Sequence, residues 1–187
     1  MSKIVRKILT VLMIGVSAIG MVGCGDNTQE QKEGVVLEQQ KEKENIEKSI
    51  EKPEPPKVNY MKQTKENLTN NILPKFSEVT IQYAKVLDNA LDKQVSWNEF
   101  IKESKTKEKI INNECMIEEE VIKNTPDKKA QDLMKQNNKM VKKMLKAMTT
   151  MRKASEEGDV IKLLKGATMI DDVEVEVKKL KKMLGEK

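Results

Sequence analysis

Between Val58 and Lys187, apolar residues recur at alternating steps of three and four, and this spacing narrows the fold class more than any other feature. It places the apolar side chains on one face of each helix, whereas a half-buried strand would need alternation at every second residue. Only 3% of the residues are aromatic and 35% are charged, which is typical of solvated helical proteins. The spacing therefore predicts an all-α domain over residues 58–187.

Start and stop signals divide this domain into helices that end near residues 93, 122, 157 and 184. Pro74 lacks an N–H and should kink or break the first helix. The run Ser96-Trp97-Asn98-Glu99 is a capping box that starts the second, and Thr125-Pro126 combines a cap with proline at the first position of the third. Gly158 stops the third helix and Asp159 caps the fourth. Because the turns are short, we expect an up-down antiparallel bundle of three to four long helices.

The composition removes most reaction chemistries. The chain has no histidine and two cysteines, so His-ligated metal sites, catalytic triads and disulfide scaffolds are excluded. Five of the eight glycines lie in the first 34 residues, which leaves no glycine-rich loop to hold a phosphate. We therefore expect a protein that is not an enzyme and has no cofactor.

The N-terminus has the three-part plan of a signal peptide. Lys3, Arg6 and Lys7 precede the apolar stretch 8–22, which is shorter than the roughly 20 residues of a membrane-spanning helix. The segment that follows, Met21-Val22-Gly23-Cys24, resembles the lipobox of bacterial lipoproteins. The resemblance covers only the first 24 residues.

In that family the cysteine thiol receives a diacylglyceryl group and the chain is cut just before the cysteine. The resemblance implies removal of residues 1–23 and a lipid anchor on Cys24 at the extracytoplasmic face of the cell membrane. Two acyl chains are needed because one gives only reversible attachment. Since nearly all basic residues are lysine, we expect a Gram-positive source.

Residues 24–57 are predicted to be a disordered tether. They are rich in Gln, Glu and Lys and end with Pro53, Pro55 and Pro56, so they cannot bury enough apolar surface to fold alone. A weak helix over residues 36–51 is the alternative. The signal peptide carries three of the 35 basic residues and none of the 30 acidic ones, so the mature chain is nearly neutral and no nucleic-acid partner is expected.

The third helix carries the sharpest charge asymmetry, with seven basic and no acidic residues between Leu133 and Ser155. A basic face could bind anionic lipid headgroups or wall polymers. The candidate residues are Lys135, Lys139, Lys142, Lys143 and Lys146. The alternative, which we favour, is local pairing with an antiparallel second helix. Folding about the turn at residues 124–125 would set Glu114 near Lys135, Glu108 near residues 140–142, and Glu103 near Lys146.

Five methionines of the third helix are expected to fill the core; a groove for a partner helix or a Cu(I) site are the alternatives. They are Met134, Met140, Met144, Met148 and Met151.

Three further residues carry expectations about packing. Cys115 is expected to be buried, Trp97 to pack across the bundle end, and Val160 to begin the core face of the fourth helix. The acidic runs Glu118 to Glu120 and Asp171-Asp172 are interpreted as solvated faces rather than metal ligands.

Three function classes fit these observations. The first, which we favour, is a membrane-anchored, non-catalytic helical module that binds a protein or an anionic envelope polymer. The second is a small-ligand or copper carrier that uses the methionine-rich interior, and the third is a passive spacer. Exposed apolar residues on the bundle would favour the first class, and an internal cavity the second.

Overall fold

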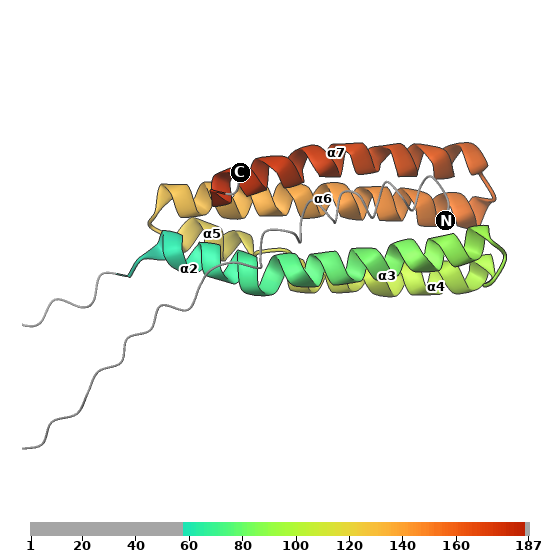
Figure 1. The fold of residues 1–187 in the computed structure, drawn as a ribbon, viewed down its shortest axis with the longest axis horizontal. Coiled ribbons are helices and arrows are strands. Elements are labelled where there is room, and N and C mark those ends of the chain that lie inside the picture. Colours follow the sequence, from blue (N-terminus) through green and yellow to red (C-terminus); the bar gives the residue numbers. More distant parts are fainter. Residues whose placement is uncertain (1–57, 186–187) are drawn as a thin grey trace, which may run out of the picture. The chain divides into compact units, whose positions relative to one another are not determined.

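The computed structural model describes residues 58–185, within which all regular structure is helical. The elements are α2 (Tyr60–Asn67), the π-helical turn η1 (Leu68–Ile72), α3 (Leu73–Leu91), α4 (Trp97–Cys115), α5 (Glu119–Asn124), α6 (Lys128–Glu157) and α7 (Val160–Leu184). The four long helices run up and down in the order of the chain (Figure 1). The predicted all-α bundle is thus confirmed for these residues. The predicted signal peptide, Cys24 and the tether lie outside the described residues.

The two ends of the bundle differ. At one end the start of α2 meets the end of α7, where Lys65 Nζ donates a hydrogen bond to the Leu184 carbonyl at 3.0 Å. The α3–α4 and α6–α7 turns form the opposite end (Figure 1). Between these ends α6 packs along α7 on one side and along α4 on another. Any chain that precedes Asn59 therefore joins the bundle at the end opposite to these two turns.

Pro74 does not split the first helix. The segments α2, η1 and α3 follow one another without a nonhelical residue, and Pro74 lies in the first turn of α3. The interruption takes the form of a π-helical turn, in which the N–H of Leu73 bonds to the carbonyl of Leu68, five residues earlier. This wider turn lets the helix pass a residue that has no N–H to donate.

The prediction of one helix from Ser96 through Ile122 is wrong. The hydroxyl of Ser96 does accept from the Glu99 N–H at 3.2 Å, but α4 ends at Cys115 and Met116 is extended. Side chains of α6 hold this break. Asn138 accepts from the Ile117 N–H at 2.9 Å and donates to the Ile117 carbonyl at 2.7 Å. These bonds occupy backbone groups that the continued helix would otherwise have paired.

The predicted start of α6 at Thr125-Pro126 is also wrong, by two residues. Asp127 is the N-cap, and its carboxylate accepts from the N–H groups of Lys129 at 2.8 Å and Ala130 at 3.1 Å. The Thr125 hydroxyl instead donates to the Val121 carbonyl at 2.8 Å, at the end of α5. An ionised cap that accepts two N–H bonds outcompetes the threonine.

The other two expected signals of this region are confirmed. Gly158 ends α6 with φ of 68°, a left-handed conformation that glycine adopts without strain. Asp159 then caps α7 by accepting from the Lys162 N–H at 2.9 Å. The resulting turn is tight, so α7 returns along α6.

The methionines of α6 form part of the core, as predicted. Their exposed fractions are 7% for Met134 and 0 to 1% for Met140, Met144, Met148 and Met151. The partner-groove and copper alternatives both require exposed thioethers, so these positions favour neither of them. Cys115 is likewise fully buried.

Candidate functional site

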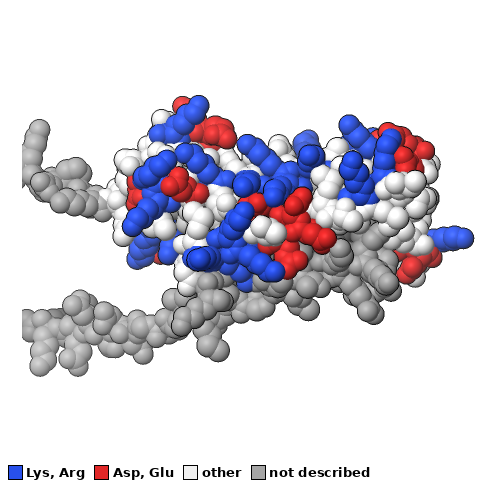
Figure 2. Space-filling view, turned by 90° about the horizontal axis from the view of Figure 1, so that it is seen from above, with Lys and Arg blue, Asp and Glu red and all other residues white. Residues whose placement is uncertain are grey.

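The five candidate lysines occupy the outer face of α6, and only Lys143 among them is half-buried. Lys139 and Lys143 pair with Glu176 of α7, and Lys142 lies 3.7 Å from Glu119 of α5. Within residues 58–185, neither Lys135 nor Lys146 has an ion pair. On the face that carries α7, basic and acidic side chains are interleaved rather than separated (Figure 2). Three of the five candidate lysines thus have an acidic partner, and two of these three share the single carboxylate of Glu176.

Glu176 is the centre of the α6–α7 charge cluster. Its side chain is 1% exposed, and its Oε1 lies 2.7 Å from Lys143 Nζ and 3.5 Å from both Lys139 Nζ and Lys179 Nζ. Gln136 Nε2 donates to the other carboxylate oxygen at 2.8 Å. Burial is the largest single effect and raises the pKa of the Glu176 carboxyl, but the hydrogen bonds from Lys143 and Gln136 and the positive charges of Lys143 and Lys139 together outweigh it and lower the pKa to about 2. Glu176 is thus held ionised inside the bundle.

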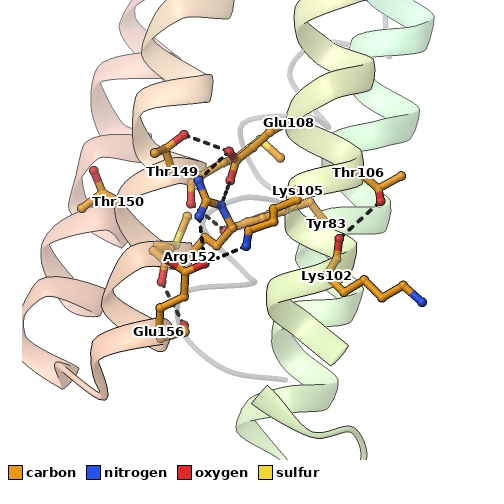
Figure 3. Close-up of polar contacts among 12 residues, drawn as sticks. Tyr83, Lys102, Lys105, Thr106, Glu108, Thr149, Thr150, Arg152 and Glu156 are labelled. Carbon is orange, nitrogen blue, oxygen red and sulfur yellow. Dashed lines mark hydrogen bonds and ion pairs between the residues drawn. The ribbon is translucent and has the colours of Figure 1, made fainter. Parts of the chain in front are cut away.

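A second cluster joins α4 to α6 around Arg152 (Figure 3). The Arg152 guanidinium donates to both carboxylate oxygens of Glu108, at 2.8 and 3.2 Å, and to Glu156 at 3.0 Å. Thr149 donates to Glu108 at 3.1 Å, and Lys105 Nζ lies 3.1 Å from Glu156. The hydrogen bond that Arg152 donates to Glu108 is the main cause that raises the pKa of Arg152. The cluster links two helices through a bidentate pair, the strongest geometry for such contacts.

The pairing predicted between the second and third helices has the wrong register. Glu108 meets Arg152 rather than residues 140–142, and Glu114 lies 3.5 Å from Lys75 of α3 rather than near Lys135. Glu103 pairs with Lys107 on its own helix. The chain between α4 and α6 contains two extended stretches and the short helix α5, so α4 is displaced along α6 relative to a direct hairpin. Local pairing exists, but mostly with other partners.

Burial makes the thiol of Cys115 and the hydroxyl of Tyr83 less nucleophilic rather than more so. Burial raises the pKa of the Cys115 thiol to about 12, with a smaller contribution from the Glu114 carboxylate. Burial is also the main cause that raises the pKa of Tyr83, whose hydroxyl donates to the Met148 carbonyl at 3.4 Å. Both shifts reduce the nucleophilic form at neutral pH.

The expected acidic runs lie on exposed surface. Glu118 to Glu120 and Asp171-Asp172 are all exposed, as predicted for solvated faces. Across residues 58–185 no group of three or more His, Cys, Asp or Glu side chains is arranged to hold a metal ion. Among the helices that the structure describes, none combines the length and apolar character needed to cross a membrane.

Four large apolar side chains are exposed near the end of the bundle formed by the two turns. They are Trp97, Val160, Ile161 and Leu164, which are 38, 67, 80 and 52% exposed. Trp97 packs edge-on against Phe100, with ring centroids 5.7 Å apart and planes at 89°. Next to it a pocket of about 120 Å³ lies between Trp97, Val160 and Leu163. We call these four exposed side chains and the pocket the apolar end.

Comparison with known protein families, curated proteins and solved structures gives no match to this chain. Its function must therefore be argued from the surfaces and clusters described above.

Sequence analysis predicted the candidate lysines but did not predict the apolar end. Val160 is predicted on the core face of the fourth helix, and it is instead two-thirds exposed, whereas Leu163 in the same turn packs into the core. The signal that could have revealed the patch is the consecutive pair Val160-Ile161 in the first helical turn. Two adjacent residues point about 100° apart on a helix, so both could not face the same core.

Proposed function

We propose that this chain is a lipid-anchored protein of the extracytoplasmic face of the bacterial cell membrane, where its helical bundle serves as a non-catalytic binding module. The anchor is supported by the similarity of Met21-Val22-Gly23-Cys24 to a lipobox. Large apolar side chains are exposed beside a pocket near the two turns, and this observation carries the binding role. Such patches on soluble surfaces commonly mark interaction sites.

The absence of a catalytic role is supported by how the ionisable groups are used. The shifted carboxylates and bases pair with one another, as in the Glu176 and Arg152 clusters, and the buried thiol and phenol are made less reactive. A passive spacer would not need an exposed tryptophan beside a pocket. The methionine-rich interior is the alternative ligand site, but its buried positions do not favour it.

Detergent phase partitioning of cells that express wild-type or Cys24→Ser protein tests the anchor. We expect the wild-type protein in the detergent phase, and the Cys24→Ser protein either unprocessed or released from lipid, because only the Cys24 thiol can accept the diacylglyceryl group. Cleavage before position 24 and unchanged partitioning of Cys24→Ser would contradict the anchor.

Lysine-reactive cross-linking on intact cells tests the binding role. A discrete adduct heavier than the chain is expected for a binding module. A spacer would give only the uncross-linked chain.

A further inference from the structure

We propose that the apolar end docks a protein partner, which inserts one large aliphatic side chain into the pocket between Trp97 and Leu163. This inference rests on the proposed function and names its site and the chemistry of its partner. Two other occupants, a second copy of this chain and an anionic polymer, are disfavoured by the structure, and the test distinguishes a third, the anchoring membrane. Each of the first two is disfavoured on a separate physical ground.

The pocket has the size and lining of a side-chain site. Its volume of about 120 Å³ is close to that of engineered apolar cavities which bind a benzene-sized group. Trp97, Val160 and Leu163 supply apolar walls, and Ser155 and Asp159 lie at its polar border. Apolar walls with a few polar groups at the border are typical of pockets that hold an anchor residue of a partner.

A second copy of the chain is disfavoured by the size of the patch. Stable dimers bury about 800 Å² and 20 to 30 residues on each subunit. The apolar end presents four exposed side chains and one small pocket. Further along α7 the outer face is mostly charged, with Asp171, Asp172, Lys178 and Lys179 exposed. A short segment of a different protein fits a patch of this extent better than a whole helix face does.

Contact of the apolar end with the anchoring membrane is an outcome that the test below distinguishes. Asn59 begins the bundle at the end opposite the α6–α7 turn, and the 30 residues of α6 span about 45 Å between the two ends (Figure 1). The predicted tether over residues 25–57 would extend about 32 Å as a coil and up to about 100 Å as an extended chain, so its length alone excludes neither end of the bundle from the membrane.

An anionic wall polymer is disfavoured by the charges that border the pocket. Lys162 Nζ pairs with Glu157 and lies 3.6 Å from Asp159, so its charge is already compensated. The Glu157 hydrogen bond is the main cause that raises the pKa of Lys162, and the Lys162 backbone N–H lowers the pKa of Asp159. Without an uncompensated cation at the pocket, recognition there depends on apolar contact, which a protein segment supplies and a charged polymer does not.

Site-specific photo-cross-linking in the full-length, lipidated protein on intact cells tests this inference. The probe p-benzoylphenylalanine is placed at position 161, 164, 175 or 146, one at a time. Val175 is the matched control, because it is apolar, 47% exposed and on the same helix but about 20 Å from the patch. Position 146 reports the basic face of α6. We expect a protein adduct at 161 and 164 that is at least about tenfold weaker at 175, and mass spectrometry of the adduct should identify an aliphatic residue at the contact.

The variant Val160→Asp supplies a second measurement. Val160 is the first residue of α7 and is mostly exposed, so an aspartate there suits the helix N-terminus and should leave helicity and thermal midpoint unchanged. It places a charge at the mouth of the pocket, and we expect the position-161 adduct to fall at least about tenfold.

Four results would overturn the inference: an adduct of twice the chain mass, a lipid or polysaccharide adduct, equal yields at 161 and 175, or none at 161. An adduct only at position 146 would reject the apolar end while leaving the binding-module function intact. Adducts at none of the four positions would reject both.

Discussion

Gly166 of α7 lies directly against Met151 of α6. A Cβ placed on Gly166 would stand 2.5 Å from Met151 Cγ, 3.0 Å from the Met151 backbone nitrogen and 3.3 Å from the Ala147 carbonyl oxygen. Real Cβ atoms do not approach so closely, so the two helices could keep this separation only with glycine here. This contact limits how closely α7 can pack on α6 at this point.

The variant Gly166→Val should lower the free energy of unfolding of residues 58–187 by about 2 kcal/mol. The added methyls overpack a site bounded partly by backbone, which costs about 1–3 kcal/mol, while the helix propensity gained over glycine offsets only a few tenths. Urea denaturation followed by circular dichroism measures the change. Thr168→Val, on the exposed side of α7, is the control and should change stability by less than about 0.5 kcal/mol. Equal stability of both variants would show that the helices separate without cost.

Because of Glu176, the free energy of unfolding of the domain should fall as the pH is lowered. Its pKa in the folded protein is about 2, below the ordinary value of 4.5, so the ionised form is stabilised by folding. The contribution is fully present above about pH 5 and is lost as pH falls through 4.5 toward 2. At pH 7, Glu176→Gln should destabilise the domain by on the order of 2 kcal/mol, and the difference from wild type should shrink toward pH 2.

The control for this measurement is Glu174→Gln, two residues earlier on α7. Glu174 pairs with Lys178 at 2.6 Å on the surface of the same helix, a kind of pair that contributes about 0–1 kcal/mol. Unfolding curves at pH 2, 4 and 7 for the three proteins distinguish the two carboxylates. A pH-independent difference between Glu176→Gln and wild type would contradict the assignment.

Asn138 should be required for the break between α4 and α5. Replacing it by leucine removes both hydrogen bonds to Ile117 and leaves a part-buried N–H and carbonyl without those partners, at a cost of about 1–3 kcal/mol. Hydrogen exchange should show faster exchange of the Ile117 amide in Asn138→Leu. Asn113→Leu, at an exposed position of α4, should leave both the stability and this amide unchanged. Protection of Ile117 in Asn138→Leu would mean that other contacts maintain the break.

The parts of the fold that were predicted correctly depend on neighbouring residues in the chain. Ser96, Gly158 and Asp159 act within three or four residues of themselves, so the sequence alone shows where those helices begin and end. The end of α4 depends on Asn138, 21 residues away from Ile117. Periodicity cannot reveal such a contact, because the second helix keeps its apolar spacing through the break.

The candidate site was predicted less well, for a related reason. Helical spacing shows which face of α6 is basic but not which helix lies beside it. The prediction paired this face with acidic residues of the preceding helix, whereas the buried partner of Lys143 is Glu176, 33 residues later on α7. Predicting the apolar end required knowing which side of the first turn of α7 faces the core, since Leu163 is buried and Val160 is exposed in that turn.

Lys143 and Lys142 are adjacent in sequence and should differ in their effect on folding. Lys143 is about one-third exposed and lies 2.7 Å from the buried Glu176, whereas Lys142 and Glu119 are both 62% exposed and 3.7 Å apart. Lys143→Gln removes the closest of three cations around Glu176, so it should cost about 1–2 kcal/mol, while Lys142→Gln should cost less than about 0.5 kcal/mol. Urea denaturation at low and high salt measures both, and equal losses would contradict the central role of Glu176.

The basic face of α6 is tested by replacing Lys135, Lys142 and Lys146 together with glutamine. These three exposed lysines should be replaceable without unfolding the bundle. Within residues 58–185 Lys135 and Lys146 have no ion pair, but each contributes only about 1 kcal/mol near an anionic surface, so wild-type domain should sediment with anionic vesicles little better than the variant at low salt. A large, salt-sensitive loss of binding in the variant would instead assign this face to an anionic surface.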